Sequence, residues 1–151
     1  MQLIETLDNA LREAIESMGY VLWGIEILQS PKGMTIRIYI DHKDGISVDD
    51  CQAVSHQVSG ILDVEDVIID QYTLEVSSPG ADRRLFSLEQ VQCFEGFEVK
   101  GRFKDLIEGY RKFQKAELKK VDQSQLTLAF DDKLVDVDFD QIEWIRIAPK
   151  F

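Results

Sequence analysis

The chain has 151 residues, of which 44% are hydrophobic, 30% are charged and 9% are aromatic, and this composition excludes a disordered or collagen-like protein. No apolar stretch reaches the roughly 18 residues of a membrane-spanning helix, and the first residues are not the basic and then apolar segments of a signal peptide. Two cysteines, Cys51 and Cys93, make no disulfide framework. We therefore expect a cytoplasmic protein with reduced thiols.

Charge is distributed unevenly along the chain. Residues 1–82 contain 4 basic and 15 acidic side chains, a net charge of −11, whereas residues 83–151 contain 13 of each kind. Within the second half, residues 100–120 carry 8 basic and 3 acidic side chains. This asymmetry favours two modules in different electrostatic environments, although an acidic surface that only maintains solubility is an equally good explanation.

The first half of the sequence begins with the pattern of a helix and two strands. Apolar residues recur at helical spacing from residue 3 to residue 18, and Gly19 follows where a helix would end. Residues 20–28 form an apolar run that predicts a strand buried on both faces. Residues 34–40 alternate between apolar and polar, which predicts a half-buried strand.

A second helix and a third strand complete the predicted α-β-β-α-β domain. Ser47 and Asp50 resemble a capping box at the start of the helix. The apolar stripe of this helix consists of Val48, Cys51, Val54, Val58, Ile61 and Leu62. Residues 67–76 predict the third strand, which leads into Pro79 and Gly80, the residue types of a type II turn.

The pattern changes beyond residue 85. Residues 87–94 predict a short helix. Five short β-like segments follow, at residues 97–103, 112–121, 126–130, 134–139 and 142–147, with tight turns predicted at 122–124 and 131–133. Strands at such close spacing favour a small antiparallel barrel. We therefore predict an α+β protein with an α/β domain at residues 1–84 and a β-barrel domain at residues 85–151.

Motifs of catalysis and of metal binding are missing from the sequence. Cys51 and His56 lie five residues apart on the second predicted helix, so their side chains point about 140° apart and do not share a zinc ion. The signature loops of nucleotide-binding proteins, serine hydrolases and zinc proteases do not occur. We predict no enzymatic activity, no metal and no cofactor.

Two groups of charged residues are candidates for binding a partner. Lys100, Arg102 and Lys104 lie in a basic stretch with aromatic neighbours, where RNA could bind. The alternative is a solvated barrel face whose aromatic side chains point inward. Asp49, Asp50 and Asp63 on the second helix could meet a basic partner, although helix capping alone explains the first two. A KH-type RNA clamp is excluded, because no two glycines have the required spacing.

Several short blocks of the sequence resemble the RimP family of bacterial ribosome maturation factors. The most specific block is Leu74–Gly80 followed by Asp82 and Arg83. Others are Asp44–Ile46, Val48–Cys51, Val54–Ser59 and Leu62–Asp66. The resemblance is strong over about residues 1–95, and it departs from the family at Ala81 and Arg84, where Leu and Pro are usual.

The resemblance implies a two-domain, non-enzymatic assembly factor whose second domain is an SH3- or Sm-like barrel. Such a factor binds the free 30S ribosomal subunit, promotes its maturation and helps to incorporate a basic ribosomal protein near the decoding centre, with 16S rRNA as a further contact. We expect a monomer that binds no membrane. The expected domain-junction motif consists of Ser77, Ser78, Pro79, Gly80, Asp82 and Arg83. The alternative is a stand-alone RNA-binding or regulatory adaptor that acts through the barrel.

Overall fold

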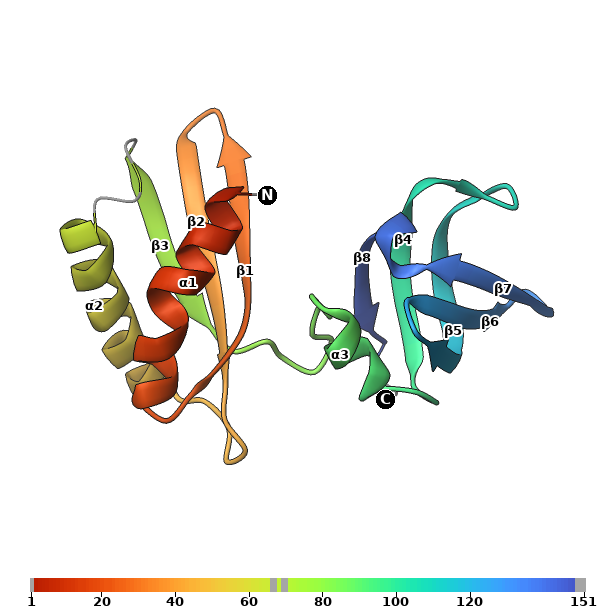
Figure 1. Ribbon diagram of the computed structural model, residues 1–151, viewed down its shortest axis with the longest axis horizontal. Coiled ribbons are helices and arrows are strands. Elements are labelled where there is room, and N and C mark those ends of the chain that lie inside the picture. Colours follow the sequence, from red (N-terminus) through yellow and green to blue (C-terminus); the bar gives the residue numbers. More distant parts are fainter. Residues whose placement is uncertain (1, 66–67, 69–70, 149–151) are drawn as a thin grey trace. The chain divides into compact units, whose positions relative to one another are not determined.

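The computed structural model describes residues 2–65, 68 and 71–148 (Figure 1). The chain divides into two compact units, Met1–Pro79 and Gly80–Phe151. The first unit combines helices with a three-stranded sheet, and the second contains a separate antiparallel sheet of five strands. The predicted α+β class is therefore confirmed.

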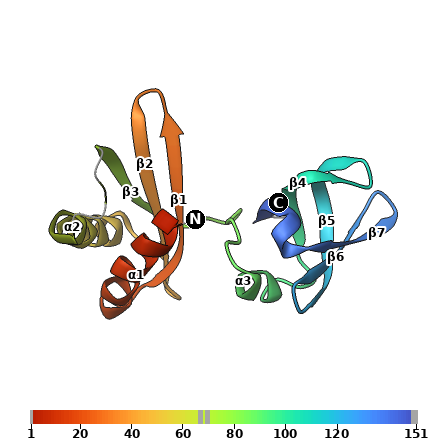
Figure 2. The ribbon, with the colours of Figure 1, turned by 45° about the horizontal axis from the view of Figure 1, so that its top comes forward.

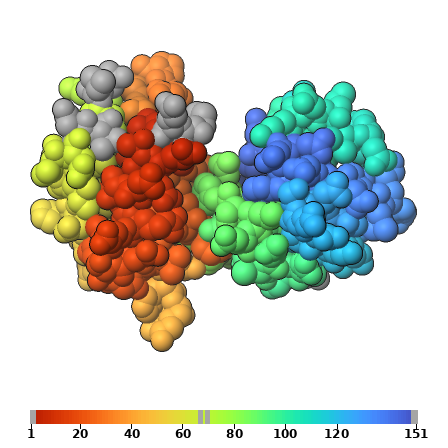
Figure 3. Space-filling view, in the orientation of Figure 1, coloured from red at the N-terminus to blue at the C-terminus, as the bar shows by residue number. Residues whose placement is uncertain are grey.

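Helix α1, Gln2–Ser17, ends in a hydrogen-bonded glycine turn, as the sequence predicts. Gly19 has a φ of +96°, which a residue without a Cβ adopts at little cost. The amide of Gly19 donates to the carbonyl of Glu16, and the amide of Tyr20 donates to the carbonyl of Ile15, the two bonds of a Schellman motif. The buried stripe of α1 consists of Leu7, Leu11 and Ile15. The outer side of α1 is visible in red in the space-filling view (Figure 3).

The sheet of the first unit has the order β1-β2-β3. Strand β1, Val21–Ser30, pairs antiparallel with β2, Gly33–Asp41, and β3, Tyr72–Ser77, pairs parallel with β2. A parallel pair needs a crossover, and helix α2, Val48–Glu65, provides it. Both helices lie on the same face of the sheet (Figure 2). The predicted α-β-β-α-β order is therefore confirmed.

Strand β1 is not buried on both faces, so that prediction was wrong. Val21 is 52% exposed and Leu28 is 38% exposed. The physical reason is that β1 is an edge strand of a sheet whose helices cover one face only. The predicted alternation in β2 is confirmed by its buried residues, which are Met34, Ile36, Ile38 and Ile40.

Helix α2 packs on the sheet through a shorter stripe than predicted. Val54, Val58 and Leu62 are buried, whereas Val48 is 73% exposed because it opens the helix, beyond the end of the buried stripe. Strand β3 begins at Tyr72, and most of the earlier part of the strand predicted at 67–76 falls outside the described residues.

The second unit starts with a short helix and continues with five antiparallel strands. Helix α3, Leu88–Gln92, is capped by the side chain of Ser87. The strands are β4 Glu98–Ile107, β5 Tyr110–Asp122, β6 Gln125–Phe130, β7 Lys133–Asp138 and β8 Ile142–Ile147, with the 3-10 helix η1 Phe139–Gln141 before the last. Their order is β7-β6-β5-β4-β8, and among the described residues the pairing does not join β7 to β8. The sheet is not closed, so the barrel stays a prediction.

Strands β4 and β5 form a longer hairpin than the sequence predicts. A tight turn joins them at Glu108 and Gly109, whose φ angles are +49° and +87°. A bulge lies farther along β5, where Val99 faces Ala116 but Gly101 faces Phe113. The inward side chains of this sheet form the second core, which includes Val99, Phe103, Phe113, Leu118, Leu126, Leu128, Val135, Val137 and Ile145.

A short segment after the unit boundary pairs with the last strand. The amide of Leu85 donates to the carbonyl of Ile145 at 2.8 Å, and the amide of Ile147 donates to the carbonyl of Arg83 at 3.0 Å. Arg84 lies opposite Arg146 in this bridge. Residues 83–85 therefore extend the sheet beyond β8.

Candidate functional site

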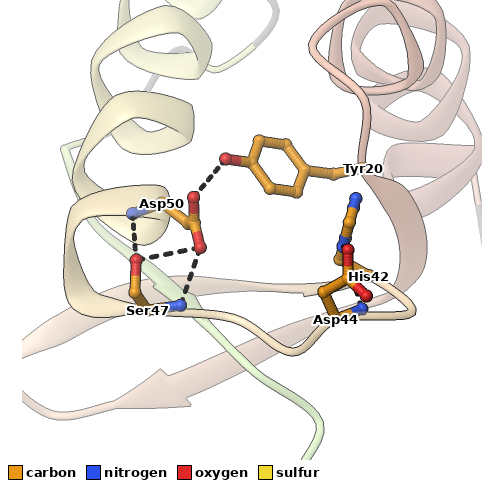
Figure 4. Close-up of polar contacts among 5 residues, drawn as sticks. All are labelled: Tyr20, His42, Asp44, Ser47 and Asp50. Carbon is orange, nitrogen blue, oxygen red and sulfur yellow. Dashed lines mark hydrogen bonds and ion pairs between the residues drawn. The ribbon is translucent and has the colours of Figure 1, made fainter.

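A cluster of polar side chains connects the turn after α1 with the first turn of α2 (Figure 4). The hydroxyl of Tyr20 donates to Oδ1 of Asp50 at 2.5 Å. Oδ2 of Asp50 accepts from the amide of Ser47 at 2.7 Å and from its hydroxyl at 2.9 Å. The amide of Asp50 donates back to Oγ of Ser47, which confirms the predicted capping box.

The loop before α2 adds a histidine to this cluster. Nδ1 of His42 accepts a hydrogen bond from the amide of Asp44 at 3.0 Å. The His42 ring meets the Tyr20 ring edge to face, with centroids 6.0 Å apart (Figure 4). The cluster therefore joins three segments: the end of α1, the loop after β2 and the start of α2.

The electrostatics of the cluster keep Tyr20 protonated and Asp50 ionised near neutral pH. The hydrogen bond from Tyr20, followed by those from Ser47, lowers the pKa of Asp50. The same bond to Asp50 is the main cause of the raised pKa of Tyr20. A raised pKa lowers the fraction of Tyr20 that is ionised near neutral pH, so little phenolate is present to act as a base or nucleophile, and the arrangement suits a structural role.

The three acidic candidates on α2 have different surroundings. Asp50 is half-buried and engaged with Tyr20 and Ser47, whereas Asp49 and Asp63 are exposed. Asp49 and Asp63 lie fourteen positions apart on one helix, which separates them by about 21 Å along its axis. The structure therefore does not bring these acids together at one point.

The junction motif begins at the end of β3. Ser77 donates through its hydroxyl to the carbonyl of Ser78, and Nε of Arg83 donates to the carbonyl of Gly80 at 3.3 Å. Gly80 has a φ of +81°, the conformation expected after proline in a type II turn. Asp82 is exposed.

Within residues 2–65, 68 and 71–148, no group of three or more His, Cys, Asp and Glu side chains is placed to hold a metal ion. No helix in this part of the chain is both long and apolar enough to cross a membrane. Burial raises the pKa of the Cys51 thiol, which disfavours the reactive thiolate.

The basic candidates lie together on one side of β4. Lys100, Arg102 and Lys104 alternate along the strand with buried residues, so all three point outward. Nε of Arg102 pairs with Oε2 of Glu143 on β8 at 2.9 Å. The aromatic neighbours Phe103 and Phe113 are at most 1% exposed. For these two aromatics, the inward-pointing alternative is confirmed.

The register of the sheet adds residues that sequence reasoning missed. Lys100 lies opposite Arg146, and Arg102 lies opposite Trp144 on the same strand. Arg84 in turn lies opposite Arg146. These three additional residues come from two distant segments, and only strand pairing places Trp144 and Arg146 beside β4 and Arg84 on the far side of β8.

Comparison with known families identifies the N-terminal part of the chain. Residues 10–82 match the model of the RimP N-terminal domain. The chain belongs to the RimP family. The RimP match spans the second half of α1 and all of β1, β2, α2 and β3, and it includes the Tyr20–Asp50 cluster. RimP proteins are ribosome maturation factors, and the resemblance found in the sequence blocks is confirmed.

Proposed function

We propose that this RimP-family chain is a cytoplasmic, monomeric assembly factor that binds the free 30S ribosomal subunit and promotes its maturation without catalysing a reaction. The observation that carries the proposal is the family match over residues 10–82. In this proposal, the factor aids the incorporation of a basic ribosomal protein near the decoding centre. It needs no metal or cofactor for that role.

The acidic half of the chain supports a basic protein partner. Residues 1–82 hold 15 acidic and 4 basic side chains. Asp49 and Asp63 are exposed on α2, while Asp50 is engaged with Tyr20. Complementary charge speeds encounter and orients the partners more than it raises affinity. We assign the encounter role to the exposed acids.

The second unit supports a contact with 16S rRNA. Lys100, Arg102 and Lys104 point outward from β4, where they can neutralise phosphate groups. We also propose that its five antiparallel strands form an SH3- or Sm-like barrel. The proposal draws on their order and on the single core formed by their inward side chains.

Sucrose-gradient fractionation tests the proposed function. A lysate that contains the tagged chain is separated at a magnesium concentration that keeps 70S ribosomes intact, and the fractions are probed for the tag. The chain should migrate with free small subunits and be absent from 70S ribosomes. A stand-alone RNA-binding or regulatory adaptor, the alternative, would stay at the top of the gradient, and that result would overturn the proposal.

Association kinetics test the role of the acids. Asp49→Asn with Asp63→Lys makes the net charge of the first unit more positive by three and leaves Asp50 in place. Glu89→Lys with Asp105→Asn makes the same change at exposed residues of the second unit. The first pair should lower the rate constant of association with the isolated basic ribosomal protein, and it should make this rate constant less dependent on salt concentration. The control pair should change neither. Circular dichroism verifies folding.

A further inference from the structure

We propose that the outward face of the second-unit sheet binds single-stranded RNA, with phosphates along two rows of cations and a base stacked at Trp144. This inference rests on the proposed function and deepens it, since it names the kind of RNA and the residues that hold it. All of these residues lie outside the matched RimP domain.

The two rows follow from strand pairing. Residues that oppose each other in antiparallel strands project from the same face of the sheet. The first row contains Arg84, Arg146 and Lys100, and the second contains Trp144, Arg102 and Lys112. Neighbouring strands lie about 4.8 Å apart, and residues two apart on a strand are separated by about 7 Å. Five cations are therefore concentrated on a small patch.

The acids of this face leave the patch positive. Glu143 is paired with Arg102 at 2.9 Å. Glu98 and Glu117 oppose each other in a separate row beyond the bulge, and Nζ of Lys119 lies 2.9 Å from Glu117. The face thus has a basic end and a mainly acidic end, and a polyanion would be held at the basic end.

A hollow beside the two rows offers a place for a base. It has a volume of about 180 Å³, and Arg84, Phe86, Lys104 and Trp144 lie on its walls. The Arg84 guanidinium lies 4.9 Å from the centre of the Phe86 ring. Asp140 and Glu143 also line this hollow.

Trp144 makes the surface suited to a single strand. Trp144 is partly exposed, and the Arg146 guanidinium lies 5.9 Å from the centre of its ring. A base stacks on an aromatic ring only when it is unpaired, because the bases of a duplex stack on each other. Stacking on an aromatic side chain contributes about 1–3 kcal/mol per base. An acidic peptide would use the cations and leave the aromatic surface unused.

Fluorescence anisotropy of a labelled 12-nucleotide single-stranded RNA tests the cation rows. Lys100→Glu with Lys112→Glu reverses one charge in each row and leaves the Arg102–Glu143 pair in place. Lys119→Glu with Lys120→Glu is the matched control, with the same charge change outside the rows. The first pair should weaken binding at least tenfold at low salt. It should also reduce the slope of log K against log salt by about 1.4, since each phosphate contact contributes about 0.7.

Tryptophan fluorescence tests the stacking. The chain has two tryptophans, Trp23 and Trp144, so Trp23→Phe leaves Trp144 as the only emitter. Single-stranded RNA should quench this emission, while a blunt-ended RNA duplex and polyglutamate should not. Binding of the paired RNA and of polyglutamate is also measured by fluorescence anisotropy.

Four results would overturn the inference: equal loss of binding in both charge-reversal pairs, no loss in the first pair, no quenching of Trp144, or equal binding of polyglutamate. The gradient experiment separates this failure from that of the proposed function. A chain that migrates with small subunits but binds no oligonucleotide retains the proposed function and loses this inference.

Discussion

The hydroxyl of Tyr20 is hydrogen-bonded to the carboxylate of Asp50, thirty residues later in the sequence, at 2.5 Å. Tyr20 directly follows the glycine that ends α1, and Asp50 lies in the first turn of α2. The bond therefore fixes the relation between the two helices on the covered face of the sheet. Ser47 holds the other carboxylate oxygen.

We predict that Tyr20→Phe destabilises the first unit and leaves the second unchanged. The substitution keeps the ring but removes the donor, so Asp50 loses the one hydrogen-bond partner outside its own helix turn that the described residues provide. The urea midpoint of the first unit should fall. Tyr72→Phe is the control, because Tyr72 packs on the same core outside this cluster. Equal midpoints for the Tyr20→Phe and wild-type proteins would contradict the prediction.

The same bond predicts that the free energy of unfolding of the first unit depends on pH. The pKa of Asp50 lies below its ordinary value of 3.8, chiefly because of the Tyr20 hydroxyl, so the stabilisation is complete above about pH 5 and lost as pH falls through the folded-state pKa. The pKa of Tyr20 lies above its ordinary value of 10.0, so the stabilisation also disappears as pH rises through that raised pKa.

Urea titrations of the wild-type and Tyr20→Phe proteins from pH 2 to 11 check this. Their difference in unfolding free energy should be constant between about pH 5 and 9 and shrink at both extremes. A difference that stays constant down to pH 2 would show that the charge of Asp50 plays no part.

Two glycines predict opposite effects of alanine. A Cβ at Gly101 would lie 2.5 Å from Cζ of Phe113 and 2.5 Å from the backbone oxygen of Trp144, so Gly101→Ala should destabilise the second unit by about 1–3 kcal/mol. A Cβ at Gly60, inside α2, meets nothing within 4 Å. Gly60→Ala should therefore stabilise the first unit by about 0.5–1 kcal/mol.

Chemical denaturation followed by separate probes for each unit measures both substitutions, because a chain of two units need not unfold in one step. The Trp23 and Trp144 signals, isolated by Trp→Phe replacement of the other, serve as these probes. A stabilised Gly101→Ala protein would contradict the close approach of β4 to Phe113 and Trp144.

Limited proteolysis should cut the chain first within residues 78–82. Ser78, Gly80, Ala81 and Asp82 are exposed, and exposed connections are the preferred sites of cleavage. Residues 83–85 are paired with β8, so trypsin should cleave slowly after Arg83 despite the suitable side chain. A broad-specificity protease and mass spectrometry of the fragments test this. First cleavage within residues 20–60 would argue against two separately folded domains.

Local signals in the sequence were sufficient for most elements. The end of α1 was predictable because the glycine conformation and the helix period are both local properties. The bounds of β8 match the prediction, since this isoleucine-rich segment lies between Gln141 and the Ala148–Pro149 pair. The β4–β5 hairpin was predicted too short, because its turn uses Glu108 in the left-handed conformation, which no residue-type rule favours.

Long-range relationships were beyond sequence reasoning. The Tyr20–Asp50 bond and the alignment of Arg84, Arg146 and Lys100 depend on how distant segments pair. A shift of one residue in register would move each side chain to the other face of the sheet. Charge counts identified the basic region at residues 100–120, but they did not show that its Lys100 side chain shares one face of the sheet with Arg84 and Arg146.

The bridge between residues 83–85 and β8 has a consequence for folding during synthesis. The strands of the first unit are all present once residue 77 has been translated, so this unit can fold while the rest of the chain is still being made. The segment next to the boundary must wait for residues 142–147, its pairing partner. The second unit is therefore the slower one to mature, because its first residues are held by its last strand.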